Sequence, residues 1–191
     1  MSESYVCSCC GLEHAGSPLS FAADFPDNYA NMSADEREAR AAIGSDQCII
    51  DGKEFWIRGC LEIPIHDQNE PFMWGLWANL WEVDFDTVDD HWETQGREKL
   101  IGPFKGRLGN SLPLYPQTAN TILTVQIKPV GTRPLFFVDD ENHPLYCEQK
   151  DGISLDVVPQ EIVVIESSSG DGGLLFDTGV RSMPVVLVVE G

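Results

Sequence analysis

The cysteines near the start of the chain have the spacing of a metal-binding turn. Cys7 and Cys10 are separated by two residues and followed by Gly11, and such a turn lets two thiolates face one metal ion. Tetrahedral zinc needs two further ligands. The nearest candidate is His14, and Cys48 is the next. The predicted ligands of a structural zinc ion are Cys7, Cys10, Cys48 and His14.

Cys60 is left out of this set because of the hairpin expected around it. Asp51-Gly52 is a tight-turn signal between strands at residues 47–50 and 54–63. A two-residue turn would put Cys60 roughly 16 Å beyond the residue facing Cys48 and on the other face, and a three-residue turn would leave roughly 13 Å. Cys60 is therefore expected to be a buried thiol.

Two other interpretations of the Cys-x-x-Cys pair stay open. The thiols could be reduced and unligated, or the pair could cycle between dithiol and disulfide. The redox interpretation is weakened because no βαβ pattern surrounds the pair.

A second group of reactive side chains follows the second strand of the hairpin. Glu62, His66 and Glu70 occur close together, with Asp67 beside them, and a histidine near carboxylates can transfer protons or bind a metal. Loops often carry such groups, although surface loops are also polar without a function. These three residues are weak catalytic candidates. The sequence contains no Ser-His-Asp elbow, phosphate loop or dinucleotide fingerprint.

The charge of the chain limits its partners. It has 12 basic and 31 acidic residues and a net charge of −19, which repels nucleic-acid phosphates and anionic membranes. The same charge favours a basic protein partner. Acidic residues gather at 82–93 and 139–141 without a base, and these runs are docking faces or simply solvated faces.

The chain is expected in the cytoplasm. Its first residues do not resemble a signal peptide, and no apolar run approaches the roughly 20 residues that span a bilayer. In a reducing compartment the six cysteines are thiols or metal ligands rather than disulfides.

The helices are indicated by caps and charge. Ser33 and Glu36 form a capping box that starts a helix running to about residue 43, with Gly44 as a stop. Residues 86–94 are expected to form an acidic helix with three inward side chains. These are Val88, His91 and Trp92.

The strands are indicated by aromatic and β-branched residues. Residues 72–83 are expected to form a strand with Trp77 and Trp81 on one face and Trp74 on the other, mainly in the core. Further strands are expected at 121–127 and 135–138, and a long ordered loop at 102–117. Two valine-rich runs end the chain.

These elements predict an α+β fold with an antiparallel sheet, a few helices on one side, a zinc-knuckle-like N-terminal turn and a β-rich C-terminal tail. The expected organisation is one domain over 1–158 and an extension over 159–191.

Several segments together resemble the bacterial domain-of-unknown-function family 2199 over about residues 5–155. The segments are 7–14, 45–52, 57–64, 70–77, 115–116, 133–135, 143–145 and 148–149. The resemblance implies a compact bacterial domain without an established activity, and it supplies no catalytic residues. The family pattern leads us to expect a closing helix. The tail of this chain departs from that pattern, because it has Pro159 and two valine-rich runs.

Three functions fit these features. The first is a non-catalytic protein-binding module with structural zinc, for example an immunity or inhibitor protein for a basic toxin. The alternative is a metal-dependent enzyme that uses the cysteine-held metal and the His66 loop. The third is an oligomerising protein whose valine-rich tail pairs edge to edge.

Overall fold

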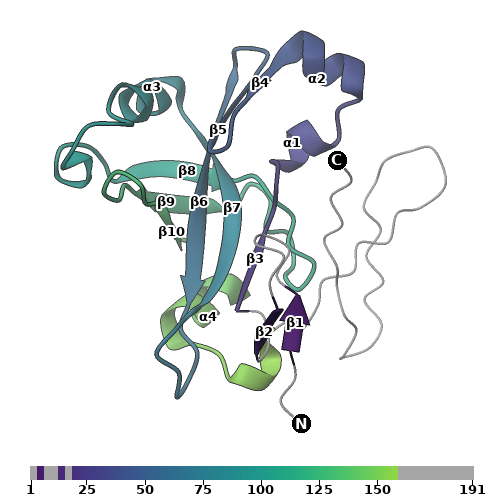
Figure 1. Ribbon diagram of the computed structural model, residues 1–191, viewed down its shortest axis with the longest axis vertical. Coiled ribbons are helices and arrows are strands. Elements are labelled where there is room, and N and C mark those ends of the chain that lie inside the picture. Colours follow the sequence, from purple (N-terminus) through teal and green to yellow (C-terminus); the bar gives the residue numbers. More distant parts are fainter. Residues whose placement is uncertain (1–3, 7–12, 16–18, 159–191) are drawn as a thin grey trace.

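The architecture is a mixed sheet that closes on itself into a small barrel, with helices around it (Figure 1). The computed structural model describes residues 4–6, 13–15 and 19–158. The strands are β1 (Ser4–Val6), β2 (Glu13–Ala15), β3 (Ser20–Ala22), β4 (Ala41–Ile43), β5 (Gln47–Ile50), β6 (Glu54–Ile63), β7 (Phe72–Leu80), β8 (Phe104–Leu108), β9 (Ile122–Gln126) and β10 (Leu135–Val138). The helices are α1 (Asp27–Ala30), α2 (Ala34–Arg40), α3 (Glu82–Asp90) and α4 (Pro144–Asp151), with 3-10 turns at Arg97–Lys99 and Leu155–Val157.

The strand order is β3-β7-β8-β9-β10-β6-β5-β4, and an additional pairing of β6 with β7 closes the barrel. Most neighbours run antiparallel, but β3 runs parallel to β7 and β10 runs parallel to β6. Parallel neighbours need a long crossover, which the three strands and one helix between β6 and β10 provide. The α+β class is confirmed, whereas the prediction of a purely antiparallel sheet is wrong.

The helices do not share one side of the sheet, contrary to the prediction. Figure 1 shows α3 near the start of β6 and α4 near its end. Both helices contact β6, because Phe85 of α3 packs on Phe55 and α4 covers the opposite end. The helices therefore flank the two ends of the barrel.

Alternate residues of β6 and β7 supply two separate cores. One face of the strand pair fills the barrel, with Leu61 and Trp74 among its buried side chains. The other face puts Trp56 and Trp77 into a smaller cluster with Cys48. This alternation is the period of two that strands impose on their side chains. Gly59 interrupts the inward row because a Cβ there would lie 2.4 Å from the Phe136 ring.

The β5–β6 hairpin forms as predicted. Ile50 pairs with Glu54 and Cys48 with Trp56, so the turn has three residues. Cys60 lies four residues beyond Trp56, roughly 13 Å along the strand. Cys60 is half-buried, which agrees only in part with the predicted buried thiol.

The tryptophan-rich strand is confirmed, but Trp81 is not part of it. Trp74 and Trp77 are buried on opposite faces of β7, as predicted. β7 ends at Leu80, and Trp81 instead precedes α3 with its carbonyl accepting from the N–H of Phe85. Its side chain is 71% exposed, so the prediction that it shares a core face with Trp77 is wrong.

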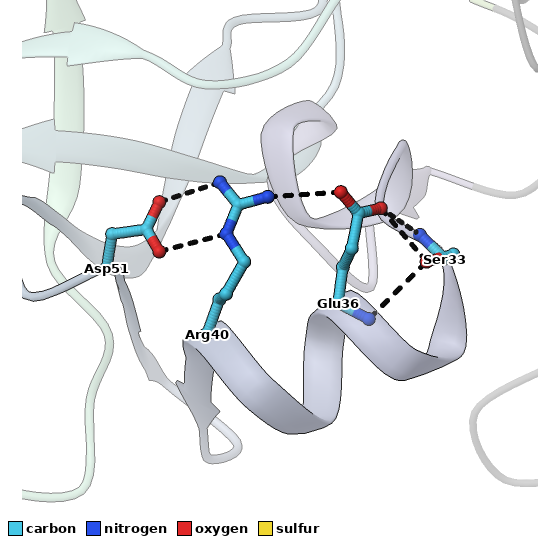
Figure 2. Close-up of polar contacts among 4 residues, drawn as sticks. All are labelled: Ser33, Glu36, Arg40 and Asp51. Atoms are coloured by element: carbon cyan, nitrogen blue, oxygen red, sulfur yellow. Dashed lines mark hydrogen bonds and ion pairs between the residues drawn. The ribbon is translucent and has the colours of Figure 1, made fainter.

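Helix α2 begins with the predicted capping box and is tied to the hairpin. The Ser33 hydroxyl accepts from the Glu36 N–H, and the Glu36 carboxylate accepts from the Ser33 N–H at 3.0 Å. Figure 2 shows that Arg40 continues this chain of contacts, donating to Glu36 at 3.1 Å and to both Asp51 oxygens at 2.9 and 2.7 Å. The helix ends at Arg40 rather than near residue 43. Residues 41–43 form β4 because their backbone pairs with β5.

Two further boundaries differ from the prediction. Helix α3 begins at Glu82 rather than 86; Val88 is buried as expected, and His91 and Trp92 follow the helix half-buried. The segment 102–117 was expected to be a loop throughout, but its first part forms β8, which pairs with β7 and β9.

The rest of that segment is an ordered loop, as predicted. Buried Asn110 accepts from the Trp77 N–H at 2.9 Å and donates to the Phe25 carbonyl at 2.9 Å. One amide thus connects the loop to β7 and to the segment before α1.

At the N-terminus, β1 and β2 form an antiparallel pair with Tyr5 opposite His14. The predicted cysteine turn at 7–12 and the tail at 159–191 lie outside the described residues, so the knuckle, the β-rich tail and the boundary at 158 stay predictions. Among the described residues, no helix has the length and apolarity needed to cross a membrane.

Candidate functional site

The loop between β6 and β7, which carries the catalytic candidates His66 and Glu70, is held in place by backbone pairing, and the third candidate, Glu62, lies near the end of β6. The His66 N–H donates to the Ile153 carbonyl at 2.8 Å, and the Ile153 N–H donates to the Pro64 carbonyl at 2.8 Å. Ile65 between them is buried. This bridge joins the loop to the segment after α4.

His66 has a structural contact in this bridge. Its Nε2 lies 2.9 Å from the Asp151 carbonyl oxygen, and because a carbonyl only accepts, Nε2 carries the proton. The chain passes close to the ring at Gly152, which has φ +81°. His66 therefore braces the loop against the end of α4.

Helix α4 forms the facing wall and is fixed at its start. His143 is the N-cap: its Nδ1 accepts from the Leu145 N–H at 3.1 Å, and its Nε2 donates to the Pro116 carbonyl at 2.8 Å. Leu145 is fully buried. These contacts set the direction in which α4 leaves the loop.

The middle of α4 is fixed to the sheet by Gln149. Its amide nitrogen donates to the Phe136 carbonyl at 2.7 Å, and its amide oxygen accepts from the Val138 N–H at 2.9 Å. The same nitrogen lies 3.4 Å from the Glu62 carbonyl. Gln149 therefore bridges β6 and β10 beyond the point where their backbones pair.

A second contact holds α4 against the ordered loop. The Tyr115 hydroxyl donates to Glu148 at 2.5 Å. Burial, followed by the bond to this carboxylate, raises the pKa of Tyr115. The phenol stays protonated and acts as a donor. Neither residue was singled out as a functional candidate from the sequence.

These walls enclose a groove of about 550 Å³ between the β6–β7 loop, β10 and α4. Its lining residues are Glu62, Pro64, Ile65, Gln68, Asn69, Glu70, Pro71, Phe137, Val138, Tyr146, Gln149 and Lys150. The volume lies within the range of small-ligand sites, about 300–1,000 Å³. Glu62 and Glu70 thus share one site, whereas His66 is not among the lining residues.

The arrangement supports binding better than proton transfer. No histidine, serine or cysteine is among the residues that line the groove, so this lining lacks the Ser–His or Cys–His pair of an activated nucleophile. Apolar and aromatic side chains form part of the lining, and carboxylates, amides and one lysine form the rest. Such a surface suits an elongated ligand with an apolar body and a charged end.

The predicted zinc ligands fall mostly outside the described residues. Cys7 and Cys10 are outside, and His14 is placed only by its backbone on β2. Cys48 is buried, and burial, with a smaller contribution from Glu54, raises its pKa to about 11. Among the described residues, no three His, Cys, Asp or Glu side chains are close enough to hold a metal.

A second surface lies at α3, at the other end of β6. Two apolar side chains at the start of the helix are well exposed, with Trp81 at 71% and Val83 at 69%. Four acidic residues of the same helix are also exposed. Asp89 accepts from the Gln47 amide, and the other three, Glu82, Asp86 and Asp90, are grouped here with Trp81 and Val83. We call these five residues the α3 surface.

Fold and groove together define a small α+β domain on a closed mixed sheet with a ligand-sized groove at one end. The chain belongs to the DUF2199 family, described as uncharacterized proteins conserved in bacteria, whose family model matches residues 6–153. No curated protein and no solved structure gives a significant match. The resemblance inferred from the motifs is thereby confirmed, and the function has to be argued from the two surfaces.

Proposed function

We propose that the chain is a non-catalytic protein-binding module for a basic protein partner, acting in the cytoplasm as an immunity or inhibitor protein does. The observation that supports this is the α3 surface, where exposed apolar side chains lie among exposed carboxylates and the last turn of the helix has no basic residue. The net charge of −19 adds a long-range attraction for a basic partner.

Glu82 lies in the first turn of α3, where the helix dipole favours a carboxylate, but the acidic residues that follow it oppose the stability of the helix. Glu82, Asp86 and Asp90 are spaced by four residues, and like charges at this spacing repel each other. The last turn of α3 contains no basic residue, so Asp90 faces the negative end of the helix dipole, a cost of about 0.3–1 kcal/mol. Carboxylates that do not serve folding are expected where a surface serves recognition.

Trp81 and Val83 supply apolar area that a partner would bury. Exposed tryptophans are over-represented among the residues that contribute most to protein–protein affinity, especially when neighbouring contacts exclude water. The surrounding carboxylates would then orient a basic partner during encounter, and the tryptophan would slow its dissociation.

The enzyme alternative receives no support from the described geometry. Cys48 lies opposite Trp56 near the start of β6, and His66 follows the end of that strand at Ile63. The seven residue steps from Trp56 to Ile63 correspond to roughly 23 Å. A metal held by Cys48 would therefore be remote from the His66 loop.

The proposal includes a structural zinc ion held by Cys7, Cys10, Cys48 and His14, which rests on ligand type and spacing. Elemental analysis of the purified untagged protein should find about one zinc per chain, and Cys10→Ser should abolish it. If the unmodified protein contained no metal and Cys10→Ser folded as well as it does, zinc would be removed from the proposal.

The binding function is tested by affinity capture from bacterial lysate at low and high salt, followed by reconstitution with the purified partner. A stoichiometric basic protein, bound more weakly at high salt, is expected. Trp81→Ala should raise its dissociation rate. The triple variant Glu82→Gln, Asp86→Asn and Asp90→Asn should lower its association rate.

A matched triple variant controls for net charge. Asp35→Asn, Glu38→Gln and Asp156→Asn remove three exposed carboxylates outside both acidic runs and should leave the association rate closer to that of the unmodified chain. Equal loss in both triple variants would show that overall charge, not the α3 surface, drives association. Binding unaffected by Trp81→Ala would refute the apolar anchor.

A further inference from the structure

The groove at the end of the barrel is a preformed site separate from the α3 surface. The β6–β7 loop is fixed by the bridge between Ile65 and Ile153, and α4 is fixed by Gln149 and by its buried Leu145. Walls that are already ordered lose little entropy when a ligand binds.

We propose that this groove binds an arginine side chain. The inference does not depend on α3 being a docking surface, since α3 and α4, the helix that contributes to the groove lining, lie near opposite ends of β6 (Figure 1). It adds a second ligand-binding site, with its own ligand chemistry, to the domain.

The charges of the groove favour a cation. Glu62 and Glu70 are both exposed, and within the described part of the chain neither carboxylate forms an ion pair. Lys150 is the one cation among the lining residues. The two carboxylates and this lysine give the lining a net charge of one negative unit. The Nζ of Lys150 lies 5.7 Å from the centroid of the Tyr146 ring, so an aromatic side chain of the groove already faces an ammonium group.

The other lining groups distinguish arginine from lysine. A guanidinium group is planar, stacks on aromatic faces and donates in a fork to carboxylates and amide oxygens. Phe137 is 40% exposed, and like Tyr146 it lines the groove. Gln68 and Asn69 add amide oxygens. The proline and aliphatic side chains of the same lining suit the methylene stem of an arginine.

The inference is tested with two probes that differ in charge but hardly in shape. Nα-acetyl-arginine amide and its neutral citrulline analogue are titrated separately into the ¹⁵N-labelled full chain, and chemical shifts are followed. The arginine probe should give saturable shifts at residues 62–71, Tyr146 and Lys150. The citrulline probe should bind far more weakly.

Variants then locate the site. Glu62→Gln with Glu70→Gln should raise the Kd of the arginine probe by roughly fivefold to thirtyfold. Glu38→Gln with Glu141→Gln, which removes the same charge elsewhere, should change it little. The α3 triple variant should also retain binding, which separates this test from that of the proposed function. Equal binding of both probes, or shifts that map to α3, would overturn the inference.

Discussion

The side-chain amide of Gln149 takes the place of a strand opposite Phe136. The backbone pairing of β10 with β6 is confined to Leu135 and Cys60, and beyond it the Phe136 carbonyl and the Val138 N–H bond to Gln149 instead. An amide side chain offers a donor and an acceptor side by side, as a peptide group does. The barrel is therefore completed by a residue of α4.

Replacement of Gln149 by leucine should destabilise the barrel where β6 and β10 separate. Phe136 and Val138 are buried, and Gln149→Leu would leave a carbonyl and an N–H there without partners. The expected loss is about 1–3 kcal/mol of unfolding free energy. Urea denaturation measures it as a lower midpoint at an unchanged slope.

Gln126→Leu is the matched control for this substitution. Gln126 is exposed on β9, so the same chemical change should alter stability by less than about 0.5 kcal/mol. If both variants unfolded at the same urea concentration, the bridging role of Gln149 would be disproved.

The sequence predicts those elements whose signals are local. The capping box at Ser33 and the Asp51-Gly52 turn depend on neighbouring residues, and both form. The end of α2 and the existence of β8 depend on distant strands. Residues 41–43 continue a helical composition but pair with β5, and β8 lies in a segment rich in Gly and Pro but fits between β7 and β9.

The same distinction applies to the sites. Glu62 lies near the end of β6 and Glu70 in the loop that follows it, and their proximity could be predicted. The groove also needs Phe137 and Lys150, which reach it only through the parallel approach of β10 and the placement of α4. The prediction that Trp81 lies in the core fails because the expected strand over residues 72–83 continues three residues past Leu80, where β7 ends. Membership in the DUF2199 family could be inferred because its motifs are short and ordered.

Arg97→Lys should destabilise the fold, although it preserves the charge. Arg97 is 3% exposed, and its guanidinium lies 4.7 Å from the Trp92 ring centroid. It donates to four carbonyls, those of Trp92, Lys128, Pro129 and Thr132. An ammonium group cannot reproduce this fork, and the expected loss in a denaturant titration is about 2–4 kcal/mol.

Arg107→Lys provides the comparison for Arg97. Arg107 is exposed and makes one 3.3 Å bond to the Asn120 carbonyl, so its replacement should cost less than about 0.5 kcal/mol. If the two variants lost similar amounts of unfolding free energy, the buried contacts of Arg97 with carbonyls would contribute no more to stability than the single contact of an exposed arginine.

Gly152→Ala should perturb the wall of the groove more than its backbone conformation alone would require. Gly152 has φ +81°, and a Cβ there would lie 3.0 Å from the Pro64 carbonyl and from the His66 ring. Gly131→Ala also introduces a side chain at a positive φ of +85° but meets no atom within 4 Å. Gly152 has in addition a ψ of 170°, a combination almost exclusive to glycine. Thermal unfolding should show a loss of about 1–2 kcal/mol for Gly131→Ala and a larger one for Gly152→Ala. Identical losses would show that crowding at His66 is unimportant.

The contacts of Arg40 predict a specific acid sensitivity of the α2 attachment. Hydrogen bonds from Arg40 lower the pKa of Asp51, and contacts with Ser33, followed by Arg40, lower the pKa of Glu36. A carboxylate whose pKa is lower in the folded state stabilises the protein above its unfolded pKa of about 4, and this contribution is lost as the pH falls through the folded value.

Arg40→Met should therefore unfold at a lower urea concentration at pH 7 but lose less further stability on acidification than the unmodified chain. Arg107→Met removes the same charge from an arginine that donates to the Asn120 carbonyl rather than to a carboxylate, so the stability of this variant should fall with pH in parallel with the unmodified chain. If Arg40→Met also followed that parallel course, the Glu36–Arg40–Asp51 contacts would not stabilise the attachment of α2 in solution.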